Sequence, residues 1–246
     1  PNDEDRHLLD ERGIAFKQTA ITQENYRKIL TPLLTKGPGQ GFCVNLSVDT
    51  GSLDIMKLCR ELGVLYVDTV IEPWVGFYYN KNADNGSRTN YALREEALTL
   101  KDSKQRAPTA VLTHGANPGL VSHLVKQALL NIAADTGVET AEPGTRADWA
   151  ALAHKLGVKV IHVAERDTQV GNRQKELNEF VNTWSVDGFV GEGCQPAELG
   201  WGSHEKNWPR DGKKHDFGRG SAIFLNQPGA GTRVRTWTPL SGHFHG

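Results

Sequence analysis

The first half of the chain alternates short apolar runs with amphipathic segments of helical length. Segment 52–63 has apolar residues at helical spacing and ends at Gly63, a residue favoured just after a helix. It lies between the apolar run 42–47, which predicts a buried strand, and a second run of strand length at 64–70, and a third such run spans 109–115. Because a helix is the usual connection between neighbouring parallel strands, this pattern predicts an α/β fold with a doubly wound parallel sheet. Further helices are expected at 4–12, at 22–34 and from Pro118.

The second half of the chain loses this alternation. Segment 145–157 has the apolar spacing of a helix, segment 158–167 predicts a strand that ends in charge, and glycine and tryptophan become frequent from residue 184. These features predict a second, sheet-rich region with long functional loops. We therefore expect a Rossmann-like α/β domain at 1–130 and a second α+β domain at 131–246.

Composition argues against several kinds of partner. The 246 residues include 28 basic and 29 acidic ones, and this balance gives no overall attraction for nucleic acid. No apolar run approaches the ~20 residues that span a bilayer, so no membrane association is expected. Cys43, Cys59 and Cys194 cannot all pair and lack metal-ligand spacing, which favours reduced thiols and a cytoplasmic location. The histidines also lack the spacing of metal ligands, so we expect no metal site.

Both ends of the chain look like internal segments. It begins at Pro1 without methionine, in residues typical of a helix that follows a strand, and it ends in LSGHFHG. We expect the sequence to be a piece of a longer protein. The dinucleotide fingerprint Gly-x-Gly-x-x-Gly is absent, and this interpretation explains its absence because that loop would precede residue 1.

Small polar side chains follow the predicted strands, at the sheet edge where ligands bind in open α/β folds. They are Asn45 and Ser47, Asp68 and Thr69, Asn117, and Glu165 in the second region. Taken together they could hold a cofactor's ribose or amide groups. Ordinary turn chemistry is the alternative interpretation of each set.

Asn117 is also a candidate N-cap for the next helix, with Pro118 at the first helical position. The apolar residues that follow at helical spacing predict a buried stripe, formed by Leu120, Val121, Leu124, Val125 and Leu129. Capping and ligand contact are compatible, since the start of the helix would fix the turn that presents Asn117.

Two segments combine carboxylates with aromatic side chains. Glu72 is followed by Pro73 and Trp74 directly after a predicted strand, and Glu192 lies between two glycines, eight residues after Trp184. Carboxylates among aromatic rings suit a cationic ligand, through charge pairing and cation–π contact. Solvated acids beside a packed aromatic core are the alternative. Neither a Gly-x-Ser-x-Gly motif nor a P-loop is present, which argues against hydrolase and kinase chemistry.

Three longer segments carry a family resemblance: NLSVDTGSLDIMKLCRELGVLYVDTVIEPW, THGANPGLVSHLVKQAL and NTWSVDGFVGEG. They closely resemble bacterial homospermidine synthases, within the saccharopine-dehydrogenase-like superfamily. The resemblance implies a homodimer that binds NAD in the first domain and substrate in the second. It implies transfer of an aminobutyl group from putrescine, or from spermidine, to putrescine, giving homospermidine and ammonia. NAD would be regenerated within each cycle, so that no net redox change occurs.

The resemblance also implies roles for individual residues. Glu72, Glu165 and Glu192 would bind amines and move protons, and which of them is the general base stays open. Trp184 would hold a cationic intermediate by its ring face. Asn117 would lie beside the nicotinamide and the reacting amine. The turns that face the cofactor would be formed by Asn45, Ser47, Asp68, Thr69, Pro118 and Gly119.

Two alternative functions remain open. A carboxyspermidine- or saccharopine-type dehydrogenase would release its nicotinamide cofactor and would need an arginine clamp for a carboxylate, for which Arg166 and Arg173 are candidates. A non-catalytic NAD-binding protein would need no cluster of carboxylates, so Glu72, Glu165, Glu192 and Trp184 argue against it.

Overall fold

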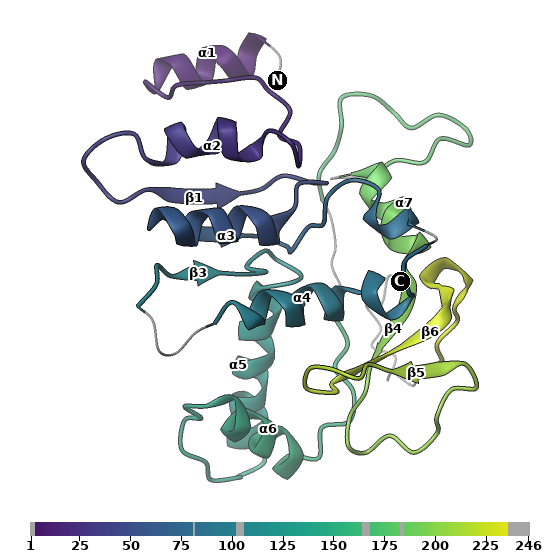
Figure 1. The fold of residues 1–246 in the computed structure, drawn as a ribbon. Helices are drawn as coiled ribbons and strands as arrows, with labels where there is room; N and C mark the ends of the chain where they lie inside the picture. The colour runs from purple at the N-terminus through teal and green to yellow at the C-terminus, as the bar shows by residue number, and fades with distance from the viewer. Residues whose placement is uncertain (1–2, 81, 102–105, 164–167, 183–184, 236–246) are drawn as a thin grey trace.

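The computed structural model of the chain describes residues 3–80, 82–101, 106–163, 168–182 and 185–235 (Figure 1). The predictions made for Glu165, Arg166 and Trp184 lie outside the described residues.

The first half forms a three-stranded parallel sheet. β1 (Phe42–Asn45), β2 (Leu65–Asp68) and β3 (Ala110–Val111) lie in the order β1-β2-β3. The register pairs Asn45 with Asp68, so the polar residues that end β1 and β2 are neighbours. The α/β fold with a parallel sheet, predicted from the alternation of segments, is confirmed.

Helix α3 (Ser52–Leu62) is the crossover between β1 and β2. Its residues Ile55, Met56 and Cys59 are almost completely buried in the core that it forms with the sheet. Burial of an Ile or Met side chain stabilises a fold by roughly 1.5–3 kcal/mol. Gly63 ends the helix with a left-handed backbone (φ 73°), as the sequence predicted.

One face of β1 is exposed, contrary to the expectation of a buried strand at 42–47. Phe42 and Val44 are 60% and 53% exposed, whereas Cys43 between them packs against the core beneath α3. Side chains alternate along a strand, so the packing of α3 on the face that carries Cys43 leaves Phe42 and Val44 on the uncovered face. The strand is confirmed, but its predicted burial is wrong.

The described N-terminal helices follow the sequence pattern closely. α1 (Asp3–Glu11) matches the helix predicted at 4–12, and α2 (Tyr26–Leu34) begins four residues later than the predicted start at 22. The delay has a local cause, because the backbone N–H of Thr22 donates to Asn25 Oδ1 and residues 22–25 form a turn instead.

Helix α5 (Leu120–Asp135) begins two residues later than predicted. Its N-cap is Gly119 rather than Asn117, so Pro118 precedes the helix. Leu129 is buried against Leu152 of α6 (Arg146–Lys155), whereas Leu120 and Leu124 are 53% and 60% exposed. The predicted buried stripe is therefore wrong for the first turns of α5, because α6 covers only the second half of the helix.

Helix α6 (Arg146–Lys155) confirms the helix predicted at 145–157. It begins with a capping box in which Thr145 and Asp148 each accept a hydrogen bond from the other's backbone N–H. The strand predicted to follow is absent from its described part, 158–163, where Val160 and Ile161 are exposed. A β-branched run forms a strand only where another strand can pair with it, and this one has no such partner among the described residues.

The second half contains an antiparallel sheet, as the loss of alternation suggested. β4 (Pro196–Gly200), β5 (Gly212–Lys214) and β6 (Ala222–Pro228) lie in the order β4-β6-β5, and helix α7 (Val186–Cys194) precedes the first of them. Buried and exposed side chains do not alternate along β6, where Ile223, Phe224 and Leu225 are all buried. Three short 3-10 helices complete the described elements: η1 (Phe77–Tyr79), η2 (Gly86–Arg88) and η3 (Gly229–Gly231).

Helix α4 (Asn90–Thr99) links the two sheets (Figure 1). Its residues Leu93 and Ala97 belong to the core under the parallel sheet. At its other end, the backbone N–H groups of Asn90 and Tyr91 donate to the two carboxylate oxygens of Glu198 on β4, at 2.7 and 2.9 Å. No helix among the described residues is long and apolar enough to cross a membrane.

Candidate functional site

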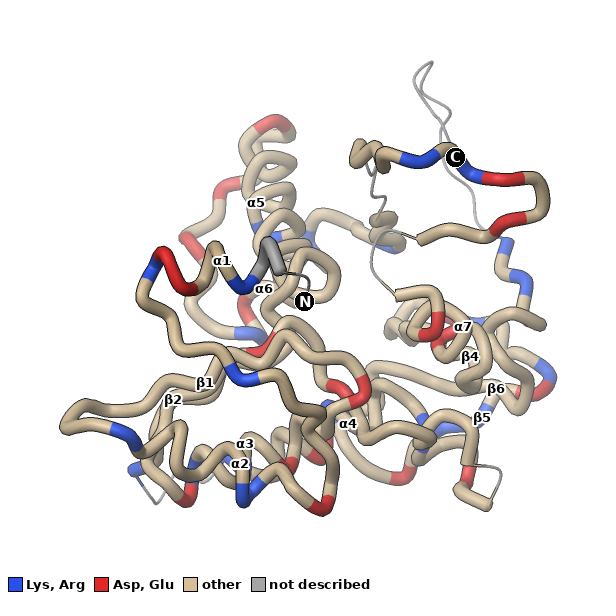
Figure 2. Tube along the Cα trace, turned by 90° about the horizontal axis from the view of Figure 1, so that it is seen from above, with Lys and Arg blue, Asp and Glu red and all other residues tan. Residues whose placement is uncertain are grey.

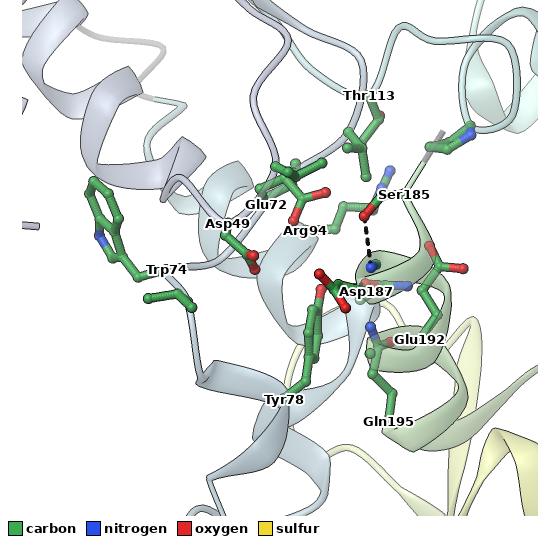
Figure 3. Close-up of a pocket in the computed structure, with 18 of the residues that line it drawn as sticks. Asp49, Glu72, Trp74, Tyr78, Arg94, Thr113, Ser185, Asp187, Glu192 and Gln195 are labelled. Carbon is green, nitrogen blue, oxygen red and sulfur yellow. Dashed lines mark hydrogen bonds between the residues drawn. The ribbon is translucent and has the colours of Figure 1, made fainter. Parts of the chain in front are cut away.

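A cavity of about 870 Å³ lies between the carboxyl ends of the parallel strands and helix α7 (Figure 3). Three residues that the sequence predicted for catalysis or substrate binding line it: Glu72, Asn117 and Glu192. They come from the loop after β2, the turn before α5, and α7. Pro118 and Gly119, predicted to face the cofactor, line the same cavity. The structure therefore brings together residues that are up to 120 positions apart in the chain.

The backbone of Glu72 is fixed to the start of α3. Ser52 Oγ accepts a hydrogen bond from the Glu72 backbone N–H at 2.9 Å, and the Ser52 backbone N–H donates to the Glu72 carbonyl at 2.8 Å. Ser52 itself is fully buried. The loop after β2 is thus held at a defined height above the sheet, and the Glu72 carboxylate lies in the cavity beside Asp49 (Figure 3).

Burial and neighbouring charge raise the pKa of Glu72 to about 7, from 4.5 for an unperturbed glutamate. Burial is the largest cause, and the carboxylates of Asp49, Glu192 and Asp68 add repulsion, while a hydrogen bond from the Asp49 backbone acts in the opposite direction. Burial also raises the pKa of Glu192. A carboxylate whose pKa is near 7 can both take and return a proton at neutral pH, as a general base requires.

The described wall of the cavity is strongly acidic. Asp49, Glu72, Asp187 and Glu192 face it, and Arg94 is the only lysine or arginine among its described lining residues. Figure 2 shows charges of both signs spread over the rest of the chain, with acidic positions on α7. Carboxylates that share a partly desolvated cavity attract a cation more strongly than surface acids do. The arrangement suits a ligand with more than one positive charge.

Helix α7 is positioned by its own cap. Ser185 Oγ accepts a hydrogen bond from the Gly188 backbone N–H at 2.9 Å, which is drawn as the dashed line in Figure 3. The cap sets the first turn, which carries Asp187, and the next turn carries Glu192. Trp184, which precedes the cap, lies outside the described residues.

Trp74 is an aromatic lining residue of the cavity and, unlike Trp184, lies among the described residues. Its indole Nε1–H donates to Asp54 Oδ2 at 2.8 Å, and its ring lies 5.7 Å from that of Tyr26. The ring packs so closely on Gly51 that a Cβ at this position would lie 2.4 Å from Nε1. Glycine at 51 is therefore needed for the ring to lie where it does.

Asn45 and Asp68 are buried in a hydrogen-bond network instead of lining the cavity. Asp68 is 0% exposed and accepts from the Tyr66 hydroxyl at 2.9 Å and from the Thr113 backbone N–H at 2.6 Å. Asn45 Nδ2 donates to the Tyr66 hydroxyl, and Asn45 Oδ1 accepts from Ser47. Thr113 has a positive φ of 53°, an uncommon conformation for a β-branched residue. The network thus supports the turn that leads to Asn117.

The turn at 115–119 depends on close backbone approach. The Leu120 backbone N–H donates to the Gly115 carbonyl at 2.8 Å, and a Cβ on Gly119, where φ is 128°, would lie 2.2 Å from that oxygen. A Cβ on Gly115 would lie 2.9 Å from the carbonyl oxygen of Thr69. Both glycines are required, and together they place Asn117 on the cavity wall. Ser47 and Thr69 lie beside this turn and the network but are not among the lining residues.

Sequence reasoning did not single out Asp49, Tyr78 or Arg94, although all three line the cavity. Asp49 could have been predicted, because it follows β1 by four residues, at the carboxyl end of the parallel strands. Tyr78 lies in an aromatic stretch without periodicity, and Arg94 lies inside a helix. Only the tertiary fold reveals that these two side chains face the cavity. No group of three metal-ligating side chains occurs among the described residues.

Comparison with protein families places this geometry in a known context. The saccharopine dehydrogenase NADP binding domain matches residues 1–112, and the saccharopine dehydrogenase C-terminal domain matches residues 115–240. The chain belongs to the saccharopine dehydrogenase family. The cavity of this saccharopine dehydrogenase family member draws on both matched regions, since Glu72 lies in the first and Asn117 and Glu192 lie in the second. The domain boundary predicted at 130/131 remains a prediction.

Two relatives and one solved structure that are similar to the chain carry the same name. The chain is 62% identical to the homospermidine synthase of Mesorhizobium japonicum, over 100% of this chain and 51% of that protein. It is 60% identical to the homospermidine synthase of Blastochloris viridis, over 98% and 50%. A crystal structure of homospermidine synthase from Legionella pneumophila in complex with NAD matches with a TM-score of 0.76 and 46% identity, over 97% of this chain and 49% of that one. The chain thus spans about half the length of these relatives.

Proposed function

We propose that the protein is a homospermidine synthase, which transfers an aminobutyl group from putrescine, or from spermidine, to putrescine and releases ammonia. The observation that carries the proposal is the cavity in which Asp49, Glu72, Asp187 and Glu192 converge. The similarity of the chain to homospermidine synthases supports it. A diamine carries two positive charges at neutral pH, and four carboxylates around one cavity provide partners for both ends.

NAD is the proposed cofactor, and the residues present fit its nicotinamide end. In the turn at 115–119 the backbone of Gly119 lies directly against that of Gly115, with no side chain between them. The same turn places Asn117 on the cavity wall. A structural relative is described in complex with NAD, which supports the same assignment. When bound, NAD would supply the hydride acceptor for the carbon that bears the substrate amine.

Glu72 is the proposed general base. An alkylammonium must lose a proton before its carbon can be oxidised, and a carboxylate with a pKa of about 7 can accept that proton at neutral pH. Glu192 shares the cavity and would hold the amine that stays charged. Partial burial of both carboxylates strengthens their attraction for the substrate, because water competes less for the charge.

Glu165 and Trp184 complete the proposal on the basis of the family resemblance alone. Glu165 would bind a substrate amine, and Trp184 would stabilise a cationic intermediate by its ring face, a contact worth about 2 kcal/mol where water is excluded. We also propose that the protein acts as a homodimer in the cytoplasm.

A carboxylate-binding dehydrogenase is the alternative proposal. It would need an arginine clamp, and Arg173 does not line the cavity but pairs with Glu176 and Glu179. Arg94 does line it, which is the observation in favour of the alternative. Arg94 shares Glu95 with Arg219, however, so part of its charge is already neutralised.

Product analysis of the full-length protein with putrescine and NAD tests the proposal. Homospermidine and ammonia should form in equal amounts without build-up of NADH. Stoichiometric NADH without homospermidine would support a dehydrogenase instead. A protein that binds NAD but converts neither putrescine nor spermidine would support the non-catalytic alternative.

A further inference from the structure

We propose that Tyr78 is a substrate-binding residue whose hydroxyl oxygen accepts a hydrogen bond from an amine end of the diamine. The inference rests on the proposed function, because it assigns Tyr78 to the binding of the same substrate. It adds a neutral acceptor to a site otherwise described by its carboxylates.

The hydroxyl of Tyr78 is oriented by its neighbour Asn90. Tyr78 belongs to η1, its side chain lines the cavity, and its O–H donates to Asn90 Oδ1 at 3.3 Å. Figure 3 shows the ring reaching into the cavity between the Asp49 side and the α7 side, which carries Glu192 and Gln195. Because an amide oxygen can only accept, this bond uses the phenolic proton, and the oxygen can then accept both from the Gln195 amide, whose hydrogen bond lowers the pKa of Tyr78, and from a ligand.

The two residues that form this bond are both held by the surrounding fold. The Tyr78 carbonyl accepts a hydrogen bond from the Arg88 guanidinium at 2.8 Å. The backbone N–H of Asn90 is fixed by Glu198 of β4, which also binds the N–H of Tyr91. The direction of the Tyr78 hydroxyl is therefore set by contacts with β4 and η2.

The charge around Tyr78 keeps the phenol in its neutral form. Burial raises the pKa of Tyr78, and the carboxylates of Glu72, Glu192 and Glu198 raise it further, with a smaller opposing effect from the side chain of Gln195. A phenol oxygen among carboxylates is a hydrogen-bond acceptor that adds no negative charge. It can therefore bind the amine both before and after the amine loses its proton.

The number of hydrogen-bond acceptors in the cavity also matches the number of N–H donors on the ligand. A primary ammonium has three N–H donors, and Glu72, the neighbouring Asp49 and Tyr78 supply three acceptors around the amine end that Glu72 deprotonates. An amine that carries a methyl group has one donor fewer. Tyr78 should therefore favour primary amines over N-methylated ones.

Kinetics of Tyr78→Phe in the full-length protein test the assignment. The substitution keeps the ring and removes the acceptor, so KM for putrescine should rise about tenfold, as expected for loss of a hydrogen bond to a charged group. The apparent affinity for 1,4-bis(methylamino)butane, added as a competing ligand, should be affected much less. The preference of the wild type for putrescine over this compound should therefore fall several-fold in the variant. Tyr26→Phe, on α2 outside the cavity, is the matched control and should change neither value.

The outcomes separate this inference from the proposed function. A wild-type protein that makes no homospermidine would refute the function itself. An active wild type with an unchanged KM, or an unchanged preference for putrescine in Tyr78→Phe, would overturn the role of Tyr78 and leave the function standing. A raised KM with a reduced preference for the primary amine supports the assignment, since a purely structural defect would weaken both ligands alike.

Discussion

The elevated pKa of Glu72 makes the pH dependence of the reaction predictable. Replacing Asp49 should change this pH dependence. Asp49 is the largest electrostatic contributor to the raised pKa after burial. Asp49→Asn keeps the shape of the side chain and removes its charge. The carboxylate of Glu72 should then ionise more easily, so the base should become active at lower pH.

The magnitude follows from the pKa of about 7. A general base with this pKa is about 9% deprotonated at pH 6 and about 91% deprotonated at pH 8, a roughly tenfold difference. A glutamate with the ordinary value of 4.5 would change by only a few per cent over the same range. Glu72 stays buried in the variant, so its pKa falls only part of the way to the ordinary value. We expect the acid limb of the pH–activity profile to move by roughly 0.5 to 1 pH unit toward lower pH.

The assay is kcat/KM for putrescine between pH 5.5 and 9, with each profile normalised to its own value at pH 8. Normalisation removes the weaker binding that loss of an acid causes by itself. The relative activity at pH 6 should rise about 2.5-fold to fivefold in Asp49→Asn. Asp135→Asn on α5 serves as the charge-matched control. An acid limb that is already below pH 5.5 in the wild type, or one that Asp49→Asn leaves in place, would refute the assignment of Glu72 as the base.

Three further predictions concern stability, the turn before α5 and Trp184. The pKa of Glu72 is raised in the folded state, so its contribution to stability is present below about pH 4.5 and is lost as pH rises through 7. Glu72→Gln should therefore raise the free energy of unfolding at pH 8 by about 1–2 kcal/mol, after discounting for solvent screening. Urea titrations should show this increase at pH 8 and little change at pH 4. Gly119→Ala should weaken NAD binding in calorimetry, because its Cβ would collide with the Gly115 carbonyl, and affinity equal to that of the wild type would contradict the proposed turn. Trp184→Phe should keep far more activity than Trp184→Ala, since a ring face survives, and equal losses in a turnover assay would exclude a cation–π role.

The sequence predicted the fold well where local signals and packing agree. Segment 52–63 combines an apolar stripe with a terminal glycine, and α3 occupies almost the same residues. The signals failed where a distant partner decides the outcome. Residues 42–47 look buried by composition, but the face of β1 depends on what covers it, and α3 covers only one side. Residues 158–163 have strand propensity but no described partner strand.

Only part of the candidate site could be predicted, again because some of its residues depend on distant partners. Acids at strand ends and between glycines can be recognised in the sequence, and Glu72 and Glu192 do share a cavity. The N-cap role of Asn117 is wrong, because the close approach of Gly115 and Gly119 moves the start of the helix to Leu120. The roles of Tyr78 and Asn90 depend on Glu198, more than 100 residues away, so no local pattern could indicate them.

Isotope retention tests the central claim most directly. The full-length protein would be incubated with NAD, an excess of unlabelled NADH and putrescine deuterated at both carbons that bear nitrogen, and the product would be analysed by mass spectrometry. If the hydride taken from the donor is returned within the same cycle, homospermidine should keep both deuterium atoms at the carbon joined to the new nitrogen. Loss of one deuterium there, or reduced NAD accumulating in place of homospermidine, would contradict the account.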